Sequence, residues 1–157
     1  MLDDKRTRQR FAVFNTHLDR WGELARVEGA RLITKRTELT AGLPYLVMGD
    51  FNAGESSQPL DALRAAGLAD TFRLIHPDAT DVATVHDFEL HRFSEKIDFV
   101  MADSSWHTMD AGIVREPAAG RLPSDHFPVF TDVELLGVAH RTPAEEEATL
   151  RAAKRQL

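Results

Sequence analysis

The sequence contains no cysteine, and this absence removes disulfide bonds and thiolate metal sites from consideration. It also has no apolar run long enough to cross a membrane. Its first ten residues, MLDDKRTRQR, are too charged for a secretion signal. We therefore expect a cytoplasmic protein without a membrane span.

An excess of basic residues is missing as well. The chain has 19 Lys and Arg residues against 25 Asp and Glu residues, which gives a formal net charge of -6. Proteins that bind duplex nucleic acid through its phosphates are usually basic, so the charge balance does not favour a nucleic-acid partner. An acidic chain is compatible with a carboxylate site that attracts a divalent cation, and equally with an ordinary solvated surface.

The composition is that of one ordinary globular domain, with 157 residues, 43% hydrophobic and 28% charged. Its apolar periodicity alternates between strand and helix patterns, which predicts the α/β fold class. We expect a polar lead at 1–10, one domain at 11–136, and a polar C-terminal helix or tail at 137–157. The domain's expected elements are strands at 11–15, 45–50, 97–101 and 127–135, helices at 21–39 and 60–66, and a loop-rich stretch at 70–93.

The stretch LVMGDFN ends a buried apolar strand with an acid and an amide two positions apart. Residues two apart on a strand point to the same face, so Asp50 and Asn52 are expected to project together while Phe51 enters the core. Gly49 permits a tight exit from the strand and a close backbone approach. The alternative is a plain turn, because Asp and Asn are common turn residues.

Polar side chains of the same kinds recur at four strand ends, in NTHLD at 15–19, GDFN at 49–52, KIDFV at 96–100 and PSDHFPV at 123–129. Carboxylate and amide oxygens suit a hard divalent cation, and imidazoles nearby suit phosphate binding or proton transfer. The set does not suit zinc, because thiolates are absent and no HExxH spacing occurs.

In this order the four motifs resemble the endonuclease/exonuclease/phosphatase superfamily, whose fold is that of deoxyribonuclease I. The resemblance runs from about Phe11 to Leu135 and covers the later, C-terminal half of the family domain. It implies a four-layer α/β sandwich with two facing mixed β-sheets and a site at one end. It also implies hydrolysis of phosphoester bonds with Mg or Mn.

The resemblance implies a catalytic role for each of five residues. Asp50 would orient the water nucleophile, and Asn52 would position the scissile phosphate. His126 would contact the phosphate, with Asp98 behind it, and His17 would be a second histidine facing the phosphate. An aspartate behind a histidine fixes its tautomer, and an imidazolium stabilises charge that grows on phosphate oxygens.

The resemblance implies that Asp50, Asn52 and Asp125 hold the metal. The family's earlier half carries a metal-binding glutamate, and no QE-like strand end occurs in this chain. The expected function is thus a divalent-metal-dependent phosphoester hydrolase, incomplete as given. The alternative is a non-catalytic remnant or a phosphate-binding module. The substrate stays open among DNA, RNA, a lipid headgroup and a small phosphoester.

Two further expectations depend on the resemblance. Relatives often have TFHG where this chain has TVHDF, so a loop near the substrate is expected around Thr84 and His86. The sheet of this half should face a second sheet, so without the missing half the chain is expected either to self-associate or to be poorly soluble and marginally stable. The apolar residues expected on that inward face are Phe14, Leu46, Met48, Phe99, Val129 and Val133. Trp21 is expected in the core or at the rim.

Overall fold

The computed structural model describes residues 1–5, 8–88, 95–117 and 120–137, so most of the predicted C-terminal helix or tail lies outside the described residues. The elements in chain order are β1 Leu2–Asp3, β2 Arg10–His17, α1 Glu23–Thr37, a 3-10 turn η1 Glu38–Thr40, β3 Tyr45–Asp50, α2 Gln58–Ala65, β4 Ala69–Asp70, α3 Thr71–Ile75, β5 Asp98–Ala102, β6 Trp106–Ile113 and β7 Val129–Leu135. Among the described helices none is both long and apolar enough to cross a membrane.

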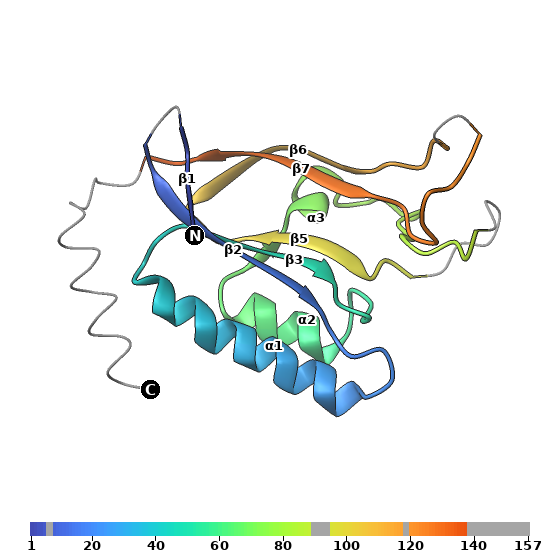
Figure 1. Ribbon diagram of the computed structural model, residues 1–157, viewed down its shortest axis with the longest axis horizontal. Helices are drawn as coiled ribbons and strands as arrows, with labels where there is room; N and C mark the ends of the chain where they lie inside the picture. The colour runs from blue at the N-terminus through green and yellow to red at the C-terminus, as the bar shows by residue number, and fades with distance from the viewer. Residues whose placement is uncertain (6–7, 89–94, 118–119, 138–157) are drawn as a thin grey trace.

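Five strands form a mixed sheet in the order β1-β2-β3-β5-β4. Strands β2 and β3 run parallel, joined by α1 as a crossover, and β5 runs antiparallel to β3. Parallel neighbours bring their carboxyl ends to the same edge of the sheet. In Figure 1 these ends lie on the right, where β5 begins.

The main core lies between this sheet and helices α1 and α2, which cover one of its faces (Figure 1). Phe51 and Phe99 are almost completely buried there and stack with ring centroids 5.2 Å apart. Leu60 and Leu63 of α2 are fully buried against them. Burial of apolar area is worth about 25 cal/mol per Å², so this layer supplies much of the driving force for folding.

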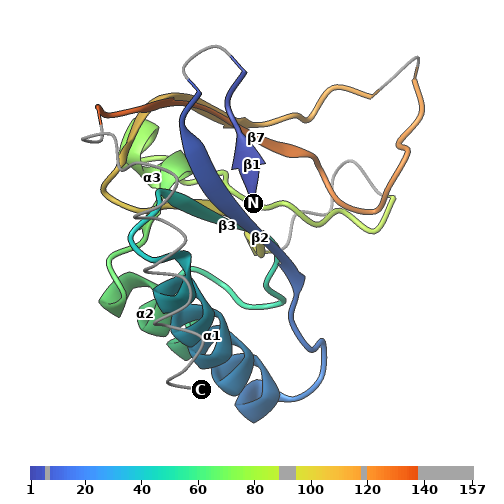
Figure 2. The same ribbon diagram turned by 60° about the vertical axis from the view of Figure 1, so that its left-hand side comes forward.

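On the opposite face of the sheet, β6 and β7 form a separate two-stranded antiparallel sheet (Figures 1 and 2). Helix α3 packs against β6, and β7 lies against β5. The helices, the mixed sheet and the sheet of β6 and β7, which we call the facing sheet, thus form successive layers. This arrangement confirms the predicted α/β class and the mixed sheet.

The structure differs from the sequence predictions in several places. The predicted polar lead contains β1, which pairs with β2 and holds Arg10 to Asp3 at 2.8 Å. The predicted loop at 70–93 contains α3, because the Asp70 carboxylate accepts the backbone N–H of Phe72 and caps a short helix. Strand β6 was not predicted, since a register shift between Thr108 and Asp110 breaks its alternation.

Two of the six residues expected to face the second sheet point the other way. Phe14 and Phe99 pack in the core between the sheet and its helices, because their strand positions place them on the same face as Val47. Leu46 lies on the opposite face and lines a hollow with Val133 of β7.

Candidate active site

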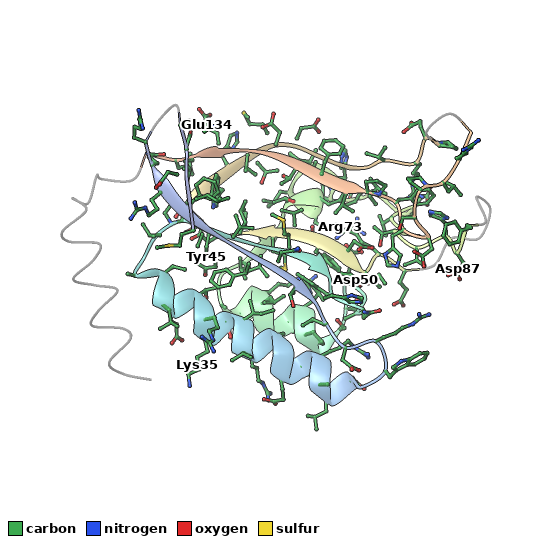
Figure 3. All side chains as sticks on the ribbon, in the orientation of Figure 1. Lys35, Tyr45, Asp50, Arg73, Asp87 and Glu134 are labelled. Atoms are coloured by element: carbon green, nitrogen blue, oxygen red, sulfur yellow. The ribbon has the colours of Figure 1, made fainter. Side chains whose placement is uncertain are left out.

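The first part of the site forms where the parallel strands β2 and β3 end. His17 and Asp50 are register partners, and the His17 Nε2 lies 3.3 Å from the Asp50 Oδ2. Figure 3 shows Asp50 at the end of β3, below β5. The Asp50 side chain is 18% exposed and that of His17 is 71% exposed, so the pair is open to a ligand.

Gly49 is required for this geometry. Its φ is +129°, and a Cβ at this position would lie 1.9 Å from the Thr16 carbonyl oxygen of the neighbouring strand. Any side chain would therefore push β2 and β3 apart just before His17 and Asp50.

The GDFN segment forms a turn, and its Asp50 also lies beside His17. The Asp50 Oδ1 accepts the backbone N–H of Asn52 at 2.8 Å, and Asn52 has a φ of +48°. The Asn52 Nδ2 donates to the Leu18 carbonyl at 2.9 Å, and the Leu18 N–H donates to the Asp50 carbonyl at 2.9 Å. These bonds fix the chain after β3 to the chain after β2.

The second part of the site is an aspartate and histidine pair from distant segments. Asp98 begins β5 opposite Asp50, and its Oδ2 lies 2.8 Å from the Nδ1 of His126. A bridge between Val85 and His126 holds the histidine segment in place. Because Nδ1 is engaged by the carboxylate, the Nε2 of His126 is the nitrogen left for a ligand.

The surroundings of Asp98 oppose its ionisation. Burial raises the pKa of Asp98 above its ordinary value, and the nearby charge of Asp50 adds to this effect. Hydrogen bonds from Thr84 and His126 act in the opposite direction and lower the pKa, but less strongly. A carboxyl group whose pKa is raised by burial, beside specific charged and hydrogen-bonding partners, is typical of functional sites.

Thr84 is a residue whose importance the sequence did not reveal. Its side chain is fully buried, and its Oγ1 accepts the backbone N–H groups of Ile97 at 3.0 Å and Asp98 at 3.2 Å. Its hydroxyl hydrogen-bonds the Asp98 carboxylate, and its carbonyl accepts the N–H of Phe127 at 2.7 Å. Thr84 therefore ties the Asp98 strand to the His126 segment. The TVHDF stretch had suggested only a loop near the substrate.

The two parts of the site converge. One oxygen of Asp50, one oxygen of Asp98 and one ring nitrogen of His126 all lie within 4.8 Å of one another. Two carboxylates this close repel each other, and a cation would relieve that repulsion. This donor set, rich in oxygen and free of sulfur, fits a hard divalent cation.

Of the residues predicted from sequence, the structure brings His17, Asp50, Asn52, Asp98 and His126 to this one edge of the sheet. Asp125 is not part of the convergent group among the described residues. Its side chain is exposed, and its Oδ1 lies 3.4 Å from the Ser124 hydroxyl.

Comparisons with known proteins identify the family and the fold of the chain. The model of the Endonuclease/Exonuclease/phosphatase family matches residues 3–126. The comparison with curated proteins gave no match.

Solved structures provide the remaining similarities. A mannosyl-6-phosphatase from Bacteroides thetaiotaomicron VPI-5482 is 29% identical, with a TM-score of 0.75 over 85% of this chain and 54% of that one. An endonuclease/exonuclease/phosphatase family protein from Bacteroides thetaiotaomicron is also 29% identical, with a TM-score of 0.72 over 83% and 52%. A 3′ phosphatase from Neisseria bound to product DNA hairpin, 17% identical, shares the fold with a TM-score of 0.64 over 78% and 60%. The chain thus spans little more than half the length of these structures.

Proposed function

The chain belongs to the endonuclease/exonuclease/phosphatase family, and from this premise we propose that it hydrolyses phosphoester bonds with a divalent cation, Mg²⁺ or Mn²⁺. The observation that carries the proposal is the Asp98–His126 pair at 2.8 Å, set beside Asp50 and His17 at one edge of the sheet. Such a pair presents an oriented imidazole next to a carboxylate that can direct water.

His126 and His17 would bind the phosphate. Asp98 holds the Nδ1 of His126 and leaves its Nε2 to donate to a phosphate oxygen. Charge that grows on that oxygen in the transition state is stabilised by a fixed imidazolium donor. The exposed ring of His17 would supply a second donor from the neighbouring strand.

Asp50 and Asn52 would position the reacting groups. The Asp50 Oδ1 accepts the backbone N–H of the turn, and the Oδ2, which lies 3.3 Å from the His17 Nε2, would orient the attacking water and take up its proton. The Asn52 amide has two N–H groups, and one is bonded to the Leu18 carbonyl. The other is left to donate to the scissile phosphate.

Asp50 and Asn52 of the GDFN segment would hold the cation, and the Asp98 carboxylate has an oxygen within 4.8 Å of one of Asp50. Asp125, the third ligand that the resemblance implied, is exposed and lies outside this convergent group. When bound, such an ion offsets phosphate charge and lowers the pKa of a bound water.

For the substrate we propose a small phosphomonoester rather than duplex nucleic acid. One relative with 29% identity is named a mannosyl-6-phosphatase, which favours a monoester of a sugar or similar alcohol. The net charge of -6 works against binding a polyanion such as duplex DNA.

A second candidate function is a phosphate-binding module without turnover. It is favoured by the small number of carboxylates in the convergent group, where Asp50 and Asp98 are the two acids among the described residues. The chain also spans little more than half of the structures it matches. Such a module would bind phosphate through His17 and His126 and release no alcohol.

The test is hydrolysis of p-nitrophenyl phosphate and bis(p-nitrophenyl) phosphate by the purified chain with Mg²⁺. The proposal expects release of p-nitrophenol that is lost in Asp50→Ala and in His126→Ala. His107→Ala, which changes an exposed histidine on β6, should keep full activity. Phosphate binding without any turnover would favour the binding module, and activity that survives both site variants would contradict both candidates.

A further inference from the structure

Trp21 is the most exposed of the large apolar side chains in the described residues, at 85%. It lies in the loop between β2 and α1, on the side of the molecule where β2 and β3 end (Figure 1). A tryptophan ring buries a large apolar area when a ligand covers it, so an exposed tryptophan near a binding site can contribute strongly to the affinity for a ligand.

The loop that carries Trp21 is internally fixed. The Asp19 Oδ1 accepts the backbone N–H of Trp21 at 2.8 Å and also that of Gly22. The Arg26 guanidinium of α1 donates to the carbonyls of Asp19 at 3.2 Å and Arg20 at 3.1 Å. A side chain presented from a fixed loop loses less conformational entropy when it binds.

The base of this loop is bonded to the candidate active site itself. Leu18 donates its N–H to the Asp50 carbonyl and accepts the Asn52 amide. Trp21 follows Leu18 by three residues, and three residues span at most about 11 Å. The loop that presents the indole therefore starts at a residue bonded to Asp50 and Asn52.

Arg20 gives this surface a charge. Its guanidinium carbon lies 5.0 Å from the centroid of the Trp21 ring. Stacking of this kind holds the cation over the ring and strengthens the attraction of both groups for a flat, electron-rich or anionic partner.

We propose that Trp21 and Arg20 form the subsite that receives the ring of the alcohol part of a phosphomonoester held by His17, His126 and Asp50. The proposal rests on the proposed function and adds that the substrate carries a ring next to its phosphate. That ring can be a sugar, which presents C–H groups to the indole, or a nucleobase, which stacks on it.

The first experiment uses Trp106→Phe, in which Trp21 is the remaining tryptophan of the two in the sequence. Its fluorescence and iodide quenching are followed with mannose 6-phosphate, adenosine 5′-monophosphate, glycerol 2-phosphate and inorganic phosphate, each with Mg²⁺. In parallel, the ring resonances of His17 and His126 are followed by NMR to report phosphate binding. We expect a ring-bearing monoester to protect Trp21, whereas glycerol 2-phosphate and phosphate shift the histidines alone.

The second experiment measures affinity by calorimetry in the otherwise unchanged chain. Trp21→Ala should weaken the ring-bearing ligand about tenfold or more, the scale of stacking on one aromatic side chain. Binding of glycerol 2-phosphate should stay as it is. Leu32→Ala is the matched control, since Leu32 is an apolar residue of α1 with 54% exposure, three helical turns further on.

The outcomes separate this inference from the function it rests on. Protection by mannose 6-phosphate assigns a sugar, and protection by adenosine 5′-monophosphate assigns a base. If the histidines respond to every phosphate ligand while Trp21 responds to none, the subsite is refuted and the proposed function stands. If the histidines respond to no ligand, the proposed function fails and the subsite fails with it.

Discussion

Thr84 determines how Asp98 meets His126, and it has no proposed contact with the substrate. Its Oγ1 accepts two backbone N–H groups at the start of β5, and its hydroxyl bonds the Asp98 carboxylate. Groups that stand behind a functional side chain fix its orientation, and their removal typically costs about ten- to a hundredfold in activity.

Thr84→Val should therefore lower the rate of phosphoester hydrolysis by about ten- to a hundredfold. It should also weaken the His126 Nδ1–H resonance seen by NMR, a change that mere loss of stability would not cause. Thr84→Ser keeps the hydroxyl and should restore most of the rate.

Thr108→Val is the matched control for this change. Thr108 is another buried threonine, on β6, and its Oγ1 has no hydrogen-bond partner among the described residues. Replacing an unpaired buried hydroxyl by a methyl group should be neutral or stabilising. Equal rates for Thr84→Val and the unchanged chain would rule out the positioning role.

Asp98→Asn should make the stability of the chain less dependent on pH. The pKa of Asp98 is raised in the folded state, chiefly by burial. Its contribution to stability is therefore full below the ordinary carboxyl pKa of about 3.9 and is lost as the pH rises through the raised value.

Urea unfolding of the two chains at about pH 4 and at neutral pH checks this prediction. The unchanged chain should lose stability relative to Asp98→Asn as the pH rises, although the variant loses its function. A relative gain for the unchanged chain over the same range would contradict the sign of the pKa shift.

The sequence was sufficient to predict which polar residues gather at the strand ends. Asp50, Asn52, Asp98 and His126 stand in motifs whose strand context is readable from apolar runs on either side. Thr84 could not be found in this way, because its role depends on β5 and the His126 segment meeting in three dimensions. The exposed position of Asp125, outside the convergent group, likewise depends on how the His126 segment packs in three dimensions.

At the scale of elements, prediction succeeded where one face of an element is clearly apolar. The bounds of β3 were predicted as observed, since Tyr45 to Met48 is a continuous apolar run between Pro44 and the GDFN turn. Strand β6 was not predicted, because its exposed residues include both polar and apolar side chains and its pairing with β7 shifts register. Helix α3 has five residues, too few to show a helical period.

An ion pair buried under β5 joins the elements that carry the site. The Lys96 Nζ lies 2.7 Å from the Asp70 Oδ2, and their side chains are 1% and 3% exposed. Lys96 precedes Asp98 by two residues, and Asp70 caps α3. The pair therefore fixes the start of β5 to the helix beneath the facing sheet.

Lys96→Met should destabilise the chain by about 3–5 kcal/mol, because it leaves the Asp70 carboxylate buried without a partner. Urea unfolding gives the free energy of unfolding. The double variant with Asp70→Asn should recover much of the loss, since the amide keeps an oxygen to cap α3 and carries no charge. Equal losses in the single and double variants would show that the charge is not the cause.

At the scale of the whole molecule, the facing sheet is thin. It has two strands, and Met109, Val114, Phe130 and Leu136, which lie on or beside them, are between 38% and 51% exposed. A hollow of about 470 Å³ opens between β2 and the facing sheet, lined among others by Phe11, Leu46 and Val133. Isolated two-stranded sheets are marginally stable in water, so this layer needs further cover.

We predict that the purified chain self-associates through β6 and β7. Apolar surface left in water is unfavourable by about 25 cal/mol per Å², and pairing two copies would cover it. Size exclusion with light scattering should give a mass above the monomer, lowered by Phe130→Lys.

Leu24→Lys is the control, because Leu24 is 73% exposed but lies on α1, on the other side of the main sheet. It should leave the mass unchanged. A monomer with a cooperative melt and no binding of dye to apolar surface would contradict self-association.

The central claim is that Asp98 and His126 act as one unit on a phosphoester. A double-mutant cycle on hydrolysis of p-nitrophenyl phosphate tests it most directly, with Asp98→Ala, His126→Ala and the two combined. Each single change should lower kcat/KM by about a hundred- to a thousandfold, and the combination should be no worse than the larger single effect. Independent, multiplying effects, or an undiminished rate in either single variant, would contradict the account.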